Sequence, residues 1–252
     1  MSRLHVFDMD GTLLRGTTAS LEIARRLGCS TDLVRLEESF AAGAVDAFGF
    51  ASEVCRLWRG LTPRITQEVF DRAPWIGGLH EVLADIRRRG ERSVVVTLSP
   101  DFFADRLAAF GVDEVVASRF PPLPLTTAPD PAGILTPGGK VTAVDRIRRV
   151  QGLDRNSCVA YGDSGSDIPL FHELGHTVAV NATASLRELA RFHYDGDDLR
   201  EAYRLARADP PTPDPVLSPM LPSLTSPSST QPSSTLSPPT LSSPTFKEPT
   251  YP

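Results

Sequence analysis

The chain has 252 residues, a formal net charge of −5 and a hydrophobic content of 40%. This acidic balance argues against a basic nucleic-acid groove or a face that binds anionic membranes, and no apolar run approaches the ~20 residues of a membrane span. The three cysteines are far apart and odd in number, which favours reduced thiols over a disulfide framework or a zinc site. Asp8 comes too early for a secretory signal, so we expect a cytoplasmic protein that binds neither nucleic acid nor membrane.

The first predicted element is a short apolar strand, LHVF, at residues 4–7, which suits a central strand covered on both faces. It is followed at once by DMDGT, in which Asp8 and Asp10 stand two residues apart. Two close carboxylates raise each other's pKa, and burial makes each costlier to ionise. The pair therefore requires a cation, a second role or exposure to solvent.

Residues 17–74 carry helical periodicity with no strand pattern between the helices. Four segments combine helix-spaced apolar residues with capping or stop residues: TASLEIARRLG, STDLVRLEESFAAG, AFGFASEVCRLWRG and TPRITQEVFDRA. We interpret this part of the chain as a small helical insert and not as part of a β-α-β alternation.

Strand and helix patterns alternate from residue 77 onward. Helices are predicted at GGLHEVLADIRRRG, SPDFFADRLAAFG (capped by Ser99), VTAVDRIRRVQG, SDIPLFHELG and ASLRELARF. The strands are predicted at RSVVVT, DEVVAS, SCVAYG and HTVAV. This alternation predicts an α/β fold with a doubly wound parallel sheet. The proline-rich residues 118–139 are expected to form an irregular loop or a small hairpin.

The composition changes near Asp209. Residues 210–252 contain 13 of the 23 prolines, many Ser and Thr, and three charged residues. Such a segment cannot bury enough apolar surface to offset the entropy of ordering, so residues 209–252 are predicted to be a disordered tail. Its Ser-Pro and Thr-Pro pairs suit phosphorylation or docking of a protein partner, and low-complexity drift explains them equally well.

Polar side chains gather at the predicted carboxyl ends of three strands, where open α/β sheets bind ligands. They are Asp8 and Asp10 after the first strand, Thr97 at the end of VVVT, Asp163 and Asp167 in VAYGDSGSD, and Lys140 at the start of the helix before that strand. Taken singly, each has an ordinary explanation as a capping acid, a β-forming threonine or a solvated lysine. Together at one edge of a sheet, they indicate a functional site.

The segments DMDGTLL, VVVT, GGK and GDSGSD resemble, in this order, the four motifs of the haloacid dehalogenase superfamily. The helical insert directly after the first motif resembles the cap of its phosphoserine-phosphatase-like branch. The resemblance covers roughly residues 2–207. It implies a Rossmann-like core of residues 1–16 and 75–208, a helical cap of residues 17–74, and a tail of residues 209–252.

The resemblance assigns the chemistry to the first motif. It implies that Asp8 is the nucleophile that forms an aspartyl-phosphate, and that Asp10 protonates the leaving oxygen and later activates water. It also implies Mg²⁺ between Asp8, the main-chain carbonyl of Asp10 and Asp163, an all-oxygen site that suits a hard cation. Such an ion relieves the repulsion within DMDGT.

The other motifs are implied to hold the phosphoryl group. The resemblance makes Thr97 a phosphate ligand and gives Lys140 the role of balancing the charge of the phosphate and the nucleophile. Asp167 is implied to orient Lys140 or the ligands of the metal. Gly11 and Gly162 are expected to permit tight turns and close approach of the backbone.

These roles predict a Mg²⁺-dependent phosphatase that hydrolyses a small phosphorylated metabolite. Asp10 favours a phosphatase over a dehalogenase, because superfamily members without this second acid tend to act on other leaving groups. Three alternatives stay open: transfer of the phosphoryl group to an alcohol, a phosphoserine phosphatase proper, and a non-catalytic scaffold protein. The intact set of motif residues argues against the last of these.

The helical insert bears on the choice of substrate. Phosphoserine phosphatases place a glutamate just after the first motif and an arginine in the cap, and ungapped matching puts Thr17 and Val54 there. The nearest residues of the required charge are Glu22, Arg56 and Arg59, which become the candidate substrate-binding residues. An unpaired buried ammonium costs several kcal/mol. We therefore expect a neutral or hydroxylated phosphate ester to be a better substrate than L-phosphoserine.

Overall fold

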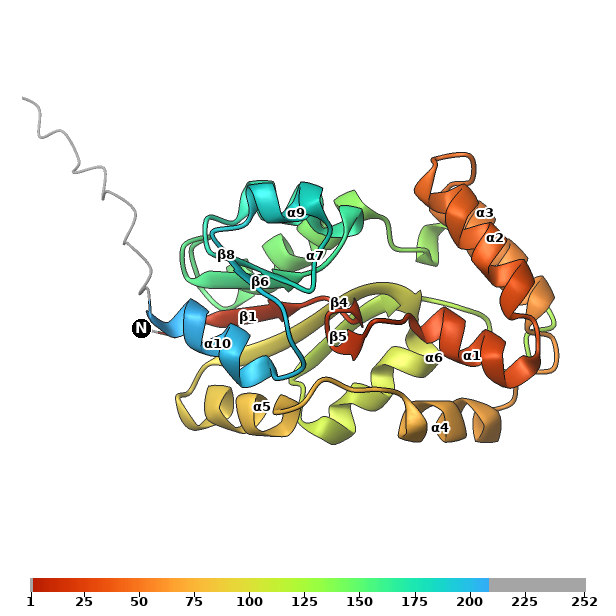
Figure 1. Cartoon of the computed structure of the whole chain (residues 1–252), viewed down its shortest axis with the longest axis horizontal. Helices are drawn as coiled ribbons and strands as arrows, with labels where there is room; N and C mark the ends of the chain where they lie inside the picture. The colour runs from red at the N-terminus through yellow and green to blue at the C-terminus, as the bar shows by residue number, and fades with distance from the viewer. Residues whose placement is uncertain (1, 209–252) are drawn as a thin grey trace, which may run out of the picture. The chain divides into compact units, whose positions relative to one another are not determined.

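A six-stranded parallel sheet lies at the centre of the computed structural model, which describes residues 2–208 (Figure 1). Its strands are β1 (Leu4–Phe7), β4 (Arg92–Pro100), β5 (Glu114–Ser118), β6 (Cys158–Gly162), β7 (Thr177–Val180) and β8 (Phe192–Tyr194). They are arranged in the order β5-β4-β1-β6-β7-β8, and every neighbouring pair is parallel. The predicted α/β fold with a doubly wound parallel sheet is confirmed.

Helices cover both faces of this sheet (Figure 1). One face packs against α5 (Leu79–Arg88) and α10 (Leu199–Ala208), the other against α7 (Pro137–Val150), α8 (Ile168–Glu173) and α9 (Ala184–Leu189). On β4, Val94 and Val96 are buried on the α7 face, whereas Val95 is buried on the α5 face. This alternation of a strand covered on both faces explains its continuous run of β-branched residues.

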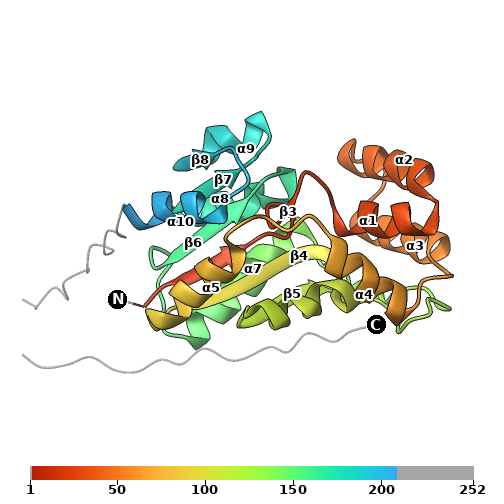
Figure 2. The ribbon, with the colours of Figure 1, turned by 60° about the horizontal axis from the view of Figure 1, so that its bottom comes forward.

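Four helices separate β1 from α5, as predicted for the insert: α1 (Ala19–Leu27), α2 (Ser30–Ala41), α3 (Ala47–Leu57) and α4 (Pro63–Arg72). The hydroxyl of Thr18 accepts a hydrogen bond from the amide of Leu21 and caps α1, which ends at Gly28 with a left-handed φ of 75°. Figure 2 shows α1, α2 and α3 grouped together beyond one end of the sheet.

The apolar interior of these helices is continuous with the interior of the sheet. Leu33 of α2 and Val54 of α3 belong to the same buried cluster as Phe7 of β1 and Val95 of β4. Hydrophobic burial therefore fixes the helical segment against the sheet. The division into a core and a cap at residues 16/17 and 74/75 stays a prediction.

The end of β4 corrects the prediction that Ser99 caps a long helix. The strand continues to Pro100, and the chain then forms only α6 (Asp101–Ala104) and the 3₁₀ helix η1 (Asp105–Phe110). The amide of Ser99 donates a hydrogen bond of 3.1 Å to Oγ1 of Thr97, and Ser99 stays in the strand. This local side-chain bond competes with the start of a helix.

Several shorter elements complete the described chain: β2 (Asp10–Gly11), β3 (Leu14–Arg15), η2 (Pro131–Gly133) and η3 (Gly165–Asp167). Residues 119–136 contain the turn η2 and no strand, so this segment is a loop and not a hairpin. The helix α9 ends earlier than predicted because Phe192 begins the edge strand β8.

The predicted tail at residues 209–252 lies outside the described residues. Within residues 2–208, no helix has both the length and the apolar character that crossing a membrane requires.

Candidate active site

Asp8 stands at the carboxyl end of β1 and contacts a buried lysine. Leu4 and Val6 of β1 pack on the α7 face of the sheet, and Asp8 continues this alternation. Lys140, near the start of α7, therefore meets it, with Nζ 2.6 Å from Oδ1 of Asp8 and both side chains at most 5% exposed. Burial, reinforced by the carboxylate of Asp167, still raises the pKa of Asp8 well above its usual value. The positive charge of Lys140 does not by itself offset the cost of burying the ionised carboxylate of Asp8.

Asp167 holds the same lysine from the other side. Its Oδ1 accepts a hydrogen bond of 2.7 Å from Nζ of Lys140, and its Oδ2 accepts bonds from the amides of Asp163 and Ser164. Burial by itself would lower the pKa of Lys140, but the carboxylates of Asp167 and Asp8 raise it above its usual value. The lysine is therefore a fixed positive charge beside Asp8.

Three carboxylates form a group that fits a divalent cation. Oxygen atoms of Asp8, Asp163 and Asp167 lie within 4.8 Å of one another. Burial, reinforced by Asp167, raises the pKa of Asp163 to about 7, and Oδ1 of Asp163 is buried without a hydrogen-bond partner. A Cβ at Gly11 would lie 2.0 Å from Oδ2 of Asp163, and one at Gly162 would lie 2.5 Å from Oδ2 of Asp167. A side chain at either glycine would collide with one of these carboxylates, so both positions need glycine. The unpaired Oδ1 of Asp163 suits a hard cation.

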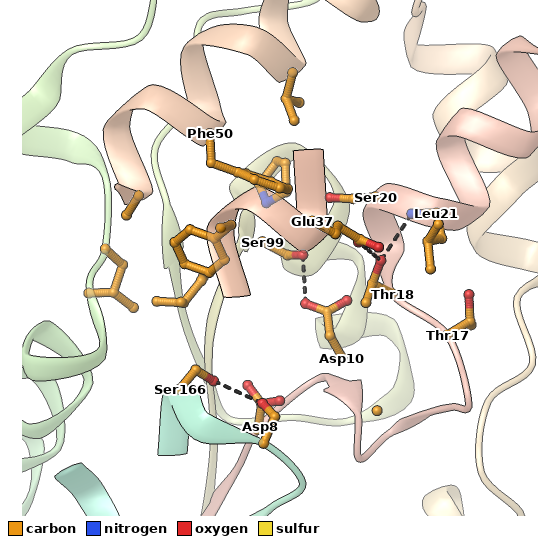
Figure 3. A pocket seen from close by; sticks show the side chains of 18 of the residues that line it. Asp8, Asp10, Thr17, Thr18, Ser20, Leu21, Glu37, Phe50, Ser99 and Ser166 are labelled. Atoms are coloured by element: carbon orange, nitrogen blue, oxygen red, sulfur yellow. Dashed lines mark hydrogen bonds between the residues drawn. The ribbon is translucent and has the colours of Figure 1, made fainter. Parts of the chain in front are cut away.

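Asp10 is held by donors from two parts of the chain, and Figure 3 shows the bond that it accepts from Ser99. Its Oδ2 accepts hydrogen bonds from Oγ of Ser99 at 2.6 Å and from Oγ1 of Thr97 at 3.2 Å, and its Oδ1 accepts one of 2.6 Å from the amide of Ala19. Burial raises the pKa of Asp10, and these hydrogen bonds cancel only part of the increase. A carboxyl group with a raised pKa is suited to giving and taking protons.

A cavity of about 450 Å³ adjoins Asp8 and Asp10. Polar residues from the strand ends form one side of it, among them Ser99, Asp163 and Ser166, and the helical segment forms the other. Figure 3 shows Phe50 and Glu37 across the cavity from Asp8. The cavity therefore has a polar region around the acids and a largely apolar wall opposite.

Ser99 is a site residue that sequence reasoning missed. It lines the cavity, whereas Thr97 is fully buried and is not among the residues that line it. The two side chains project from the same face of β4 because they are two residues apart. The repeated hydroxyl in VVVTLSP was the available signal, but the expected helix cap obscured it.

The predicted arginines are not at the cavity. Arg56 is exposed and donates hydrogen bonds to Glu53 of its own helix, and Arg59 is exposed as well. Val54, the position matched to the arginine of phosphoserine phosphatases, is fully buried and lines the cavity. An apolar side chain therefore stands where the resemblance would require a cation.

Glu22 is also outside the described lining of the cavity, although Thr17 lines it. Glu22 accepts a hydrogen bond of 2.7 Å from Thr17 and pairs with Arg25 along α1. The acid of the helical segment that does line the cavity is Glu37 of α2, whose Oε1 accepts a hydrogen bond of 2.9 Å from Oγ1 of Thr18. Nothing in the local sequence distinguishes Glu37, because only the packing of α2 on α1 brings it there.

A family comparison agrees with this arrangement. The sequence profile of the haloacid dehalogenase-like hydrolases matches residues 5–172, more than half of the chain, and the match includes all six predicted motif residues. The chain belongs to the haloacid dehalogenase-like hydrolase family. The resemblance predicted from the four motifs is thus confirmed.

Relatives of this haloacid dehalogenase-like hydrolase include phosphoserine phosphatases. The one from Archaeoglobus fulgidus is 27% identical over 196 residues, which cover 75% of this chain and 55% of that protein. The one from Methanocaldococcus jannaschii is 25% identical over 201 residues, which cover 79% of this chain and 95% of that protein. The chain thus spans about half the length of the first relative and nearly all of the second. Within the family, these matches show similarity to its phosphoserine-phosphatase-like branch.

Solved structures share the fold of this haloacid dehalogenase-like hydrolase. A phosphoserine phosphatase with a phospho-aspartyl intermediate analogue superposes with a TM-score of 0.70 at 22% identity, over 81% of this chain and 98% of that one. A HAD-family hydrolase from Salmonella enterica superposes with a TM-score of 0.72 at 22% identity, over 79% and 69%. At this identity the likeness concerns the fold, and it agrees with the parallel sheet.

Proposed function

We propose that this protein is a phosphatase that cleaves a small phosphate monoester through a phosphorylated Asp8. The observation that carries the proposal is the bond of 2.6 Å between Asp8 and Lys140 at the edge of the cavity. In the first step an oxygen of Asp8 bonds to phosphorus while the bond between phosphorus and the ester oxygen breaks. The charge of Lys140 offsets the negative charge of the nucleophile and the phosphoryl group.

Asp10 serves as the acid and the base of the two steps. It gives a proton to the leaving ester oxygen, and it then takes a proton from the water that attacks phosphorus and releases Asp8 and inorganic phosphate. Its raised pKa supports the first role, and the donors Ser99 and Ala19 keep it in place for both. In this scheme Ser99 contacts the phosphoryl group, and the buried Lys140 offsets its charge through the bond to Asp8. Thr97 positions Asp10, and Asp167 positions Lys140.

The cation of this scheme is Mg²⁺. Asp8, Asp163 and the main-chain carbonyl of Asp10 would hold it, and the orphaned oxygen of Asp163 supports this assignment. When bound, Mg²⁺ supplies positive charge to the phosphoryl oxygens. The protein contributes carboxylates that lie close together, and Gly11 and Gly162 leave the space that these carboxylates occupy.

Two finer assignments follow from the relatives and the chemistry. The names of the relatives favour L-phosphoserine as the first compound to test. Transfer of the phosphoryl group to an alcohol stays as an alternative to hydrolysis, because a phosphorylated Asp8 can be attacked by the oxygen of an alcohol as well as by that of water. An assay with added alcohols distinguishes hydrolysis from phosphoryl transfer. It measures how the products divide between free phosphate and a new phosphate ester.

The proposal is tested by isolating the phosphorylated residue. We expect that acid quenching during turnover of p-nitrophenyl phosphate with Mg²⁺ yields a phosphorylated peptide that contains Asp8, as read by mass spectrometry. The variant Asp32→Asn, which changes an exposed aspartate of α2, is the matched control and should yield the same peptide. Turnover with phosphate found on another residue, or on none after rapid quenching, would contradict the mechanism.

A further inference from the structure

The cavity wall contributed by the helical segment contains one carboxylate and no cation. Among the described residues that line the cavity there is no Lys, Arg or His. Glu37 is the acid that faces the cavity from the helical segment, at a distance in the chain from the catalytic aspartates. A leaving group that enters this wall meets one negative charge.

The surroundings of Glu37 are largely apolar, apart from the hydroxyl of Thr18 that bonds to it and the charge of Arg25, which lies outside the lining of the cavity. Leu21, Phe40, Phe50 and Val54 line the same wall, and the rings of Phe40 and Phe50 lie 5.3 Å apart between centroids. A carboxylate in such surroundings is poorly solvated, and burial, with the charge of Asp10 adding, raises its pKa. A cation beside it would restore the ionised form, and aromatic rings also attract ammonium ions.

We propose that the substrate is a phosphate monoester of an amino alcohol, whose ammonium group pairs with Glu37 and whose carbon atoms pack on Phe40, Phe50 and Val54. This inference rests on the proposed phosphatase function and narrows its substrate class. It replaces the expectation of a neutral or hydroxylated ester, which assumed that no acid reaches the cavity from the helices.

The same wall disfavours a leaving group with a carboxylate. L-phosphoserine carries both an ammonium and a carboxylate, and its carboxylate would enter a wall with no cationic side chain and with Glu37 nearby. Burying an anion without a partner is costly, and repulsion by a second anion adds to that cost. Amino alcohol phosphates without the carboxylate are therefore preferred.

The first test compares substrates that differ in charge alone. Choline phosphate and 3,3-dimethylbutyl phosphate have the same shape, but a carbon replaces the charged nitrogen in the second. We expect kcat/KM of the wild-type protein with Mg²⁺ to be about 10- to 100-fold higher for choline phosphate, the range of a hydrogen bond or contact with a charged group. O-Phosphoethanolamine should likewise be turned over faster than L-phosphoserine.

The second test assigns the preference to Glu37. We expect Glu37→Gln to lower the ratio of the two kcat/KM values about 10- to 100-fold, and Glu37→Asp to retain part of it. Glu38→Gln is the matched control, because Glu38 is the exposed neighbour on the same helix and should keep the wild-type ratio. Thermal melting of each variant reports whether the loss of the bond to Thr18 alters the fold.

The outcomes separate this inference from the proposed function. A wild-type protein that hydrolyses p-nitrophenyl phosphate but shows no preference for the charged ester overturns the inference and leaves the phosphatase standing. A preference that survives in folded Glu37→Gln overturns the role of Glu37. Absence of turnover of every ester, p-nitrophenyl phosphate included, overturns both.

Discussion

The hydroxyl of Ser99 donates a hydrogen bond of 2.6 Å to Oδ2 of Asp10, at the point where β4 meets the loop after β1. The other oxygen of Asp10 accepts the amide of Ala19, the first residue of α1. Asp10 thus connects the sheet to the helical segment that closes over the cavity. The orientation of the proposed acid therefore depends on both parts of the chain.

Replacing Ser99 by alanine should lower kcat without unfolding the protein. The substitution removes the shortest side-chain bond to Asp10 and leaves the carboxylate held by Ala19 and the longer bond from Thr97. We expect about a tenfold loss of kcat for an alkyl phosphate. Ser52→Ala, on the exposed side of α3, serves as the control. Unchanged kinetics in Ser99→Ala would show that Asp10 is positioned without it.

Asp8→Asn should abolish turnover in a folded protein. An amide is a poor nucleophile, and loss of the nucleophile costs more than about a thousandfold in kcat. The buried position near Lys140 keeps its shape, because asparagine is close to aspartate in size. Phosphate release and the circular dichroism spectrum are measured beside the control Asp32→Asn. Near-wild-type phosphate release by folded Asp8→Asn would contradict a mechanism in which Asp8 is the nucleophile.

Removal of divalent metal with EDTA should stop turnover, and Mg²⁺ should restore it. Ca²⁺ should be a poor substitute, because its longer bonds and looser coordination misplace the nucleophile relative to phosphorus. Mg²⁺ should also raise the melting temperature of the wild-type protein, since it offsets repulsion among buried acids. This increase in melting temperature should be smaller in Asp163→Asn, because the substitution removes the charge of the carboxylate whose Oδ1 has no hydrogen-bond partner. Full activity of metal-stripped protein contradicts the assignment.

Glu91→Gln should destabilise the protein at neutral pH but not in strong acid. Burial alone would raise the pKa of Glu91, but hydrogen bonds from His5 at 3.0 Å and Arg207 at 2.6 Å outweigh it and hold the pKa at about 2. The ordinary value is 4.5, so the ionised form contributes about 3 kcal/mol above that pH. This contribution is lost as the pH falls from 4.5 towards 2.

The measurement for Glu91 is urea unfolding at a series of pH values. The difference in unfolding free energy between wild type and Glu91→Gln should be largest at pH 6–7 and should close between pH 4.5 and 2. Glu188→Gln, at an exposed position of α9, should show no such closure. A constant difference across this range would mean that the hydrogen bonds of ionised Glu91 with His5 and Arg207 do not stabilise the fold.

Val54→Arg should raise kcat/KM for L-phosphoserine relative to kcat/KM for O-phosphoethanolamine. The substitution brings a cation to the cavity wall, at the position where the resemblance expects one. We expect the ratio of the two kcat/KM values to shift about tenfold towards L-phosphoserine. Because Val54 is buried, melting curves are compared with those of Val54→Met, which adds volume without charge. A ratio equal to that of Val54→Met would show that carboxylate recognition is set elsewhere.

Five strands of the sheet and the four motifs, in their order along the chain, were readable in the sequence, whereas the edge strand β8 was not. Parallel strands bring their carboxyl ends to one edge of the sheet, so the residues that follow VF, VVVT and VAYG had to meet there. Short-range signals also sufficed for the four helices between β1 and α5, because caps such as Thr18 and Gly28 act within one turn. These features depend on local patterns and on general rules of sheet topology.

The identity of the residues that face the cavity was decided by the tertiary structure. Glu37 reaches the cavity only because α2 packs on α1, and Arg56 points away because Val54 occupies the buried side of α3. Ser99 lines the cavity in place of Thr97 because β4 runs three residues beyond the predicted strand RSVVVT. Contacts between segments distant in the chain set these positions, and no periodicity within one segment contains that information.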